Sequence, residues 1–224
     1  PTLSMRQSLQ ESPYGIIAEF KRKSPSKGWI KEEGLPEEIP AQYAANGASA
    51  ISILTEEHFF GGHLKYIKIA RPLVQCPILR KDFIVDPYQI YQARIIGADA
   101  ILLIAAALTV DECKRLAAKA HELSLEVLLE IHSEKELEYL NEHIDMIGVN
   151  NRNLGTFHTD VENSFRLAGK LPKETLLVSE SGISQPETIK QLRQAGFRGF
   201  LIGETFMKTA VPGETLRTFI QTLQ

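Results

Sequence analysis

Eight short apolar segments alternate with eight amphipathic segments along this chain of 224 residues, and the alternation predicts an α/β fold of the TIM (β/α)8 barrel type. The apolar segments are nearly continuous in Ile, Leu and Val, as is typical of parallel strands covered on both faces. A short sequence motif repeats at 46–50 and 96–100, and a less similar copy stands at 195–199. The motif is typical of a helix end that is followed by a tight turn and the start of a strand. A doubly wound open sheet is the alternative, but its first turn is usually Gly-rich, whereas here that turn is rich in Lys, Ser and Pro. The sequence therefore predicts one barrel domain over residues 1–224.

The expected strands and helices follow one another along the whole chain. Asp86 and Thr109 stand ahead of first turns, as helix caps do, and Gly196 stands where a helix would end. The strands are predicted at Gly15–Lys21, Ala50–Leu54, Pro77–Asp82, Ala100–Ile104, Glu126–Ile131, Met146–Asn150, Leu176–Glu180 and Gly199–Gly203. The helices are predicted at Pro36–Asn46, Gly62–Leu73, Pro87–Ile96, Val110–Leu123, Glu134–Asn141, Val161–Gly169, Pro186–Ala195 and Gly213–Gln224.

The first 14 residues lie outside the repeating pattern. Within this N-terminal extension, Ser4–Gln10 is expected to form a short helix, either beneath the barrel or across its active face. We expect the extension to be the remnant of a longer segment.

Composition places the chain among ordinary soluble globular proteins. It is 43% hydrophobic and 24% charged with a formal net charge of −3, which argues against a nucleic-acid partner. Cys76 and Cys113 are too few for a disulfide framework and lack the spacing of metal ligands. No apolar run has transmembrane length and the start lacks the architecture of a signal peptide, so we expect a cytoplasmic protein without membrane contact. Since no long exposed apolar stripe is evident, we also expect a monomer.

Charged residues stand at the ends of predicted strands, where barrels of this type carry their catalytic groups. Glu19 and Lys21 are two residues apart in the first strand, so both side chains point to the same face. By the same alternation, Lys81 and Glu130 are expected to look into the mouth of the barrel. For the first pair, a solvated charge cluster beyond a strand that ends at Ala18 is the alternative.

Two further strands end in polar groups, one in Asn150 with Arg152 and the other in Glu180. A single charge at a strand end usually meets solvent, but five strands that each end in an ionisable or amide group favour a functional cluster. Lysines crowded among carboxylates permit acid–base chemistry, because burial and pairing shift their pKa values. The six histidines are not spaced as metal ligands, so no metal site is predicted.

The turns after the last two strands have the composition of a phosphate site. Ser181-Gly182 and Gly203-Glu204 occupy the positions where such barrels commonly bind phosphate through backbone N–H groups. Glycine lets the backbone approach an anion closely, and Glu204 would contribute only its N–H. The loop after the first strand, which includes Ser24, also has a composition suited to wrapping an anionic substrate.

Aromatic residues follow the second and third strands. Phe60, beside Gly61 and Gly62, and Phe83 could form an apolar wall for a flat ring. For Phe83, packing beneath the loops is an equally good interpretation.

With these motifs in order, the chain resembles the indole-3-glycerol-phosphate synthase family over nearly its whole length. The resemblance implies ring closure of 1-(2-carboxyphenylamino)-1-deoxyribulose 5-phosphate, with loss of CO₂ and water, in tryptophan biosynthesis. It implies a carboxy-lyase that acts on a small sugar phosphate and needs no metal or organic cofactor. The motifs are Ile17–Lys21, Ser24–Gly28, Ile53–Glu56 with Phe60, Leu79–Phe83, Gly97–Ala100, Leu129-Glu130, Gly148–Leu154, Ser179–Ile183 and Leu201–Gly203.

The resemblance also implies roles for matching positions. Lys81 resembles the general acid that protonates the substrate carbonyl oxygen, and Glu130 the acid–base carboxylate of the later dehydration. Lys21 would be a second acid or electrostatic partner, and Glu19 would orient Lys21 and contact substrate hydroxyls. The expected substrate contacts are Asn150, Arg152 and Glu180, together with Ser24, Phe60 and Phe83, and the expected phosphate cradle is Ser181, Gly182, Gly203 and Glu204.

The sequence departs from the family pattern at two places, and two alternative functions remain to be compared with this interpretation. Family members usually carry a longer segment before the first strand, and some have a small residue where Glu204 stands. Phosphoribosylanthranilate isomerase would use an early Cys, which the first strand lacks. A non-catalytic phosphate-binding barrel would have lost an acid–base position, whereas Lys21, Lys81 and Glu130 are all present.

Overall fold

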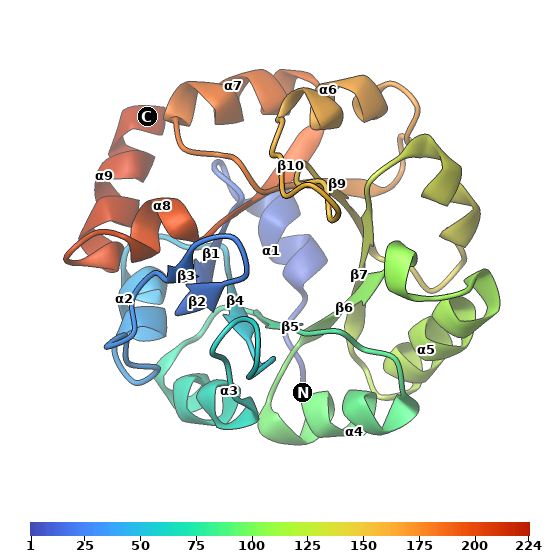
Figure 1. Cartoon of the computed structure of the whole chain (residues 1–224), viewed down its shortest axis with the longest axis horizontal. Coiled ribbons are helices and arrows are strands. Elements are labelled where there is room, and N and C mark those ends of the chain that lie inside the picture. Colours follow the sequence, from blue (N-terminus) through green and yellow to red (C-terminus); the bar gives the residue numbers. More distant parts are fainter.

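Eight parallel strands close into a barrel in the computed structural model, which describes residues 1–224. Each strand pairs with its neighbours in chain order, and the last pairs with the first to complete the ring (Figure 1). The predicted (β/α)8 barrel is thereby confirmed. The barrel strands are β1 (Ile16–Phe20), β4 (Ala50–Leu54), β5 (Ile78–Lys81), β6 (Ala100–Ile104), β7 (Glu126–Ile131), β8 (Met146–Asn150), β9 (Leu176–Glu180) and β10 (Phe197–Ile202).

A ring of helices surrounds the barrel, as Figure 1 shows. Most begin and end within two residues of the predicted bounds, and several start at a proline or a capping side chain. The helices are α2 (Ile39–Ala45), α3 (Leu64–Ala70) continued by η1 (Arg71–Leu73), α4 (Pro87–Ile96), η2 (Ala105–Ala107), α5 (Val110–Glu122), η3 (Glu134–Tyr139), α6 (Glu162–Ala168), α7 (Pro186–Gln194), α8 (Glu204–Met207) and α9 (Pro212–Leu223).

Three local features differ from the prediction. The segment expected as a helix over Glu134–Asn141 is the short 3₁₀ helix η3, which suits a tight connection between two strands. Helix α2 begins three residues later than expected, with Pro40 in its first turn. Beyond β1, a small antiparallel hairpin forms from β2 (Lys23–Ser24) and β3 (Gly28–Trp29) and shapes the first loop.

The side chains of the barrel strands alternate between two apolar cores. Residues such as Ile17, Leu79 and Leu128 point into the barrel, where they form a small interior cluster. Their neighbours along each strand, such as Ile16 and Ile78, point outward to a larger core beneath the helices. This alternation fixes which residue at each strand end faces the mouth of the barrel.

The N-terminal helix α1 (Met5–Glu11) closes the lower end of the barrel, and Figure 1 shows it on the barrel axis. Met5 and Leu9 are fully buried within the interior cluster. The backbone N–H of Leu3 donates to Asp99 at 2.8 Å, and that of Arg6 to Glu126 at 2.8 Å, and both acceptors stand at strand starts. Of the two predicted positions for this helix, the structure has the one beneath the barrel. No helix of the chain combines the length and the hydrophobicity that crossing a bilayer requires.

Leu9→Ala tests how much this closure stabilises the barrel. The substitution should lower the free energy of unfolding by about 2–5 kcal/mol, because it leaves a cavity among fully buried side chains. Denaturant unfolding measures the effect, with Leu3→Ala, at a 41% exposed position of the same extension, as the control. Equal, small losses for both variants would show that the helix does not close the barrel in solution.

Candidate active site

A cavity of about 690 Å³ opens at the carboxyl ends of the barrel strands. Its volume lies in the range of small-molecule sites. All the predicted site residues line it except Ser24 and Glu180. Those that line it are Glu19, Lys21, Phe60, Lys81, Phe83, Glu130, Asn150, Arg152, Ser181, Gly182, Gly203 and Glu204.

Glu19 is the centre of the charged cluster and is itself almost completely buried. Its Oε1 lies 3.4 Å from Nζ of Lys21, and its Oε2 lies 3.2 Å from Nζ of Lys81. Ser52, its register partner on β4, donates to Oε2 at 2.8 Å. A Cβ on Gly203 would stand 3.1 Å from Oε1, so glycine at this position leaves room for the carboxylate.

The two lysines have opposite pKa shifts although both touch Glu19. Burial lowers the pKa of Lys21, and the attraction of Glu19 is further offset by repulsion from Lys81 and Arg152. Burial alone would also lower the pKa of Lys81, but the carboxyl groups of Glu19, Glu180 and Glu130 outweigh it and raise that pKa above its ordinary value. Lys81 is therefore held as an ammonium ion, whereas Lys21 releases its proton more readily than an ordinary lysine.

The Glu19 carboxylate is held ionised by the same contacts. Burial would raise its pKa, but Lys81, Lys21 and the hydroxyl of Ser52 together lower the pKa below the ordinary value. A buried charge of this kind persists only because it is paired and hydrogen-bonded.

Glu180 lies beside Glu130 inside the barrel and not on the cavity wall. Burial, followed by the neighbouring Glu130 charge, raises the pKa of Glu180 well above its usual range. Neither of its carboxyl oxygens has a hydrogen-bond partner in the structure. A Cβ on Gly148 would stand 2.1 Å from Oε1 of Glu180, so that glycine leaves the space the carboxyl occupies. The raised pKa favours the protonated form of Glu180, behind the residues that line the cavity.

Asn150 and Arg152 extend the polar wall beyond β8. Oδ1 of Asn150 accepts from the N–H of Arg152 and from the hydroxyl of Ser181, both at 2.9 Å. Its Nδ2 donates to no protein group, so this amide is available to a ligand as a donor. The guanidinium of Arg152 donates to Thr159 at 3.2 Å and to Ser26 at 3.3 Å, which links this wall to the hairpin after β1.

Four residues that line the cavity have backbone N–H groups without a hydrogen-bond partner in the protein: Ser181, Gly182, Gly203 and Glu204. Ser181 and Gly182 have φ angles of 71° and 79°, in the left-handed region. Unpaired N–H donors are unusual away from water, and a group of them suits an anion. Lys208 also lines the cavity, although no sequence motif singles it out.

An aromatic wall stands on the other side of the barrel. The rings of Phe60 and Phe83 are 6.3 Å apart between centroids and tilted by 44°. The carboxylate of Glu56 accepts from the N–H groups of His58 and Phe60, which shapes the turn that carries Phe60. Leu154 and Phe157, which sequence reasoning did not single out, add further apolar surface.

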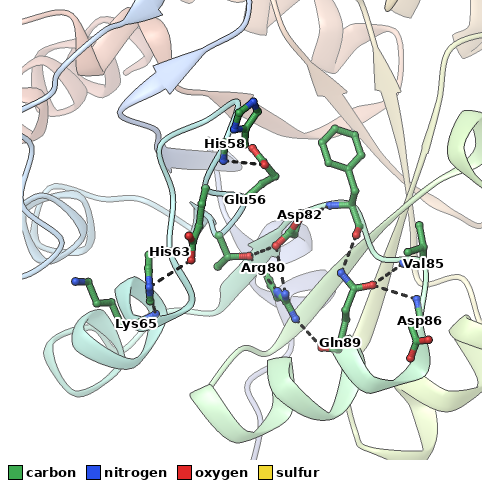
Figure 2. A network of polar contacts seen from close by, with 12 residues as sticks. Glu56, His58, His63, Lys65, Arg80, Asp82, Val85, Asp86 and Gln89 are labelled. Atoms are coloured by element: carbon green, nitrogen blue, oxygen red, sulfur yellow. Dashed lines mark hydrogen bonds and ion pairs between the residues drawn. The ribbon is translucent and has the colours of Figure 1, made fainter.

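A buried network of polar side chains, drawn in Figure 2, anchors the strand end that carries Lys81. Arg80 points away from the cavity and donates to Thr55 at 3.0 Å, to Asp82 at 3.2 Å and to the carbonyl of Gln89 at 2.6 Å. Thr55 in turn donates to Asp82 through its hydroxyl at 2.6 Å and to the carbonyl of Lys81 through its N–H at 3.1 Å. The backbone of Lys81 is therefore clamped between β4 and the loop that follows β5.

The side chain of Gln89 fixes that loop from the first turn of α4 (Figure 2). Its Oε1 accepts from the N–H groups of Val85 at 2.7 Å and Asp86 at 3.1 Å, and its Nε2 donates to the carbonyl of Phe83 at 2.8 Å. The aromatic wall and the Lys81 strand end thus share one rigid support.

Ser24 does not reach the cavity, contrary to the contact expected for it. The β2–β3 hairpin turns its side chain inward, where the hydroxyl accepts from the N–H of Lys27 at 3.2 Å. Pro25 and Lys27 of the same loop line the cavity instead. No group of three or more His, Cys, Asp or Glu side chains is arranged to hold a metal ion.

Comparisons with known proteins give one consistent family. The family model for indole-3-glycerol phosphate synthase matches residues 1–219. A protein named indole-3-glycerol phosphate synthase from Bacteroides thetaiotaomicron is 70% identical over 221 residues, covering 99% of this chain and 85% of the relative. One of the same name from Magnetococcus marinus is 50% identical, over 92% of this chain and 79% of its own length.

Two solved structures with the same fold are far more distant from this chain in sequence than these relatives. The 3-hexulose-6-phosphate synthase of Salmonella typhimurium has a TM-score of 0.72 at 15% identity, covering 93% of this chain and 98% of its own. Thiamine phosphate pyrophosphorylase of Pyrococcus furiosus has a TM-score of 0.71 at 14% identity and covers 98% of both chains. These two likenesses establish the barrel and nothing about chemistry.

Glu19→Gln tests the electrostatic account of the two lysines. Without the Glu19 carboxylate, the ammonium form of each loses its nearest counter-charge, so the pKa values of both Lys21 and Lys81 should fall. NMR titration of ¹³C-methylated lysines measures this, and Lys21 should deprotonate first as the pH rises. Ser52→Ala, which removes only a neutral hydrogen bond to Glu19, should shift both values less. Unchanged titrations in Glu19→Gln would refute the account.

Arg80→Leu tests the clamp on the Lys81 strand end. The loss of a buried charge partner should destabilise the fold by about 3–5 kcal/mol and, in addition, speed amide hydrogen exchange at Phe83, Val85 and Asp86. Arg71→Leu breaks a comparable Arg–Asp pair at the opposite end of the barrel and serves as the matched control. If both variants change exchange at these amides equally, the network stabilises the fold without anchoring this loop in particular.

Proposed function

The chain belongs to the indole-3-glycerol phosphate synthase family, and on that basis we propose how its cavity residues carry out the reaction. The enzyme is a decarboxylating lyase that converts 1-(2-carboxyphenylamino)-1-deoxyribulose 5-phosphate to indole-3-glycerol phosphate. The observation that supports the proposal is that Lys81, paired with Glu19, lines the same cavity as four residues whose backbone N–H groups have no protein partner.

Ring closure needs an acid beside the substrate carbonyl. The aromatic carbon that bears the carboxylate attacks the sugar C2 carbonyl, and the electron pair of the C=O bond moves to oxygen. Lys81, held as an ammonium ion by Glu19, donates a hydrogen bond and then a proton to that oxygen. Loss of CO₂ from the same ring carbon then restores the aromatic ring.

Dehydration needs a base and a second acid. One proton leaves the carbon that was C1 of the sugar, and the C2 hydroxyl leaves as water, which completes the indole. Glu130 is placed to take the proton and Lys21, whose pKa burial lowers, to protonate the leaving hydroxyl. Glu180, whose pKa is raised by burial and by the Glu130 charge, would stay protonated beside it.

The two ends of the cavity fix the direction of the substrate. The phosphate would accept hydrogen bonds from the N–H groups of Ser181, Gly182 and Gly203, with Glu204 contributing its N–H and Arg152 its charge. The carboxyphenyl ring would lie against Phe60 and Phe83, and Phe83 follows β5, which stands opposite β9 in the ring of strands. Nδ2 of Asn150 is free to bind a substrate hydroxyl between the two ends.

The direct test is turnover of the substrate in the presence of a chelator. Indole fluorescence should appear without added metal or cofactor, because the proposed acids and base all belong to the chain. Tight binding without indole would instead indicate a binding-only barrel. Neither binding nor indole would contradict the substrate assignment.

Lys81→Ala separates chemistry from binding. The rate of turnover should fall by at least about 100-fold, which is the scale of a lost general acid, while inhibition by inorganic phosphate should be unchanged. The exposed Lys65 of α3 supplies the matched control, since Lys65→Ala removes a lysine that does not line the cavity. Turnover by Lys81→Ala at the wild-type rate would overturn the role given to Lys81.

A further inference from the structure

A cluster of buried polar side chains lies directly behind the phosphate cradle and has no part in the chemistry described above. It consists of Asn151, which follows β8, Ser164 on α6 and Ser179 on β9, and all three are buried. Their side chains hydrogen-bond to one another, with the hydroxyls of Ser164 and Ser179 2.8 Å apart. Buried polar groups are costly unless satisfied, so a fully connected cluster at this position calls for an explanation.

The amide of Asn151 uses all of its hydrogen-bonding capacity, in two directions. Its Oδ1 accepts from the N–H of Ser164 at 3.0 Å and from the Ser164 hydroxyl at 2.8 Å. Its Nδ2 donates to the hydroxyl of Ser179 at 3.1 Å and to the backbone carbonyl of Ser181 at 3.0 Å. Oδ1 therefore contacts helix α6, and Nδ2 contacts the end of β9 and the turn that follows it.

The turn that Nδ2 holds is strained. Ser181 has a φ of 71°, a conformation that costs a residue with a Cβ about 1–3 kcal/mol unless the surroundings impose it. The carbonyl of Ser181 points toward Nδ2 of Asn151, so the N–H of Gly182, which is trans to that carbonyl in the same peptide, points to the opposite side. Both Ser181 and Gly182 line the cavity, and neither N–H has a hydrogen-bond partner in the protein. The hydrogen bond from Nδ2 of Asn151 to the carbonyl of Ser181 constrains the residue that has this unfavourable φ angle.

We propose that Asn151 is a positioning residue for phosphate binding, which holds the Ser181 carbonyl so that the N–H groups of Ser181 and Gly182 converge on the substrate phosphate. This inference rests on the phosphate cradle proposed above. Asn151 itself does not line the cavity and acts only through the turn. Its neighbour Asn150 has the complementary task, since its Oδ1 holds the Ser181 hydroxyl from within the site.

Ser164 supplies the matched control because it contacts the opposite side of the same amide. Asn151→Ser keeps a hydroxyl in the cluster but is too short to reach the Ser181 carbonyl. Ser164→Ala removes the hydroxyl that bonds Oδ1 and leaves Nδ2 in place. Both variants weaken the cluster, and only the first releases the turn.

The experiment compares the inhibition constant of inorganic phosphate, competing with substrate, in the wild type and in both variants. Asn151→Ser should raise this constant and the KM by about tenfold, equivalent to about 1.4 kcal/mol, with a much smaller change in kcat. Ser164→Ala should leave both constants near the wild-type values, even where denaturant unfolding shows a comparable loss of stability.

Each other outcome overturns a specific claim. Equal changes in the two variants, or no change in Asn151→Ser, would show that Asn151 only stabilises the fold. A wild-type enzyme that turns over substrate but is not competitively inhibited by phosphate would overturn the cradle, and this inference with it. If Asn151→Ser does not fold, Asn151→Asp replaces it, because this variant keeps the outline and the acceptor side but lacks the Nδ2 donor when ionised.

Discussion

The contact of one buried carboxylate, Glu19, with two ammonium groups is the interaction on which the rest of the site depends. An ionised carboxylate inside a barrel is stable only while both cations and the Ser52 hydroxyl remain in reach. Strand register supplies that reach, since Glu19 lies opposite Ser52 and the backbone of Lys81 is clamped to the end of β4. The charged cluster is therefore a consequence of how tightly the strand ends are held.

Small residues make the space for this charge. Gly203 leaves room for Glu19, and Gly148 leaves room for the carboxyl of Glu180. In the lower half of the barrel, apolar side chains such as Leu79, Leu128 and Met146 fill the same inward positions. The same alternation of side chains thus produces an apolar core in the lower half of the barrel and an acid–base site in the upper half. The apolar core stabilises the fold, whereas the buried charges destabilise it.

Much of this was predictable from sequence because side-chain alternation in strands is strict. Once Leu79 and Leu128 are placed inside the barrel, Lys81 and Glu130 must follow them to the mouth, and the structure has them there. Side chains in loops follow no such alternation. The sequence therefore does not show that the β2–β3 hairpin turns the Ser24 side chain away from the cavity.

The depth at which each side chain is buried could not be predicted from the sequence either. Glu180 has the inward register, yet it stands against Gly148 and beside Glu130 and not on the cavity wall. The contacts of Asn151 join β8, β9 and α6, so they depend on tertiary packing that no local pattern encodes.

The most direct test is a crystal structure with a substrate analogue whose C2 carbonyl is reduced to an alcohol. The account predicts Nζ of Lys81 at about 3 Å from the C2 oxygen, and the phosphate on the N–H groups of Ser181, Gly182 and Gly203. An analogue bound in the reverse direction, with its phosphate beside Phe60 and Phe83, would contradict the central claim that Lys81 is the acid of ring closure.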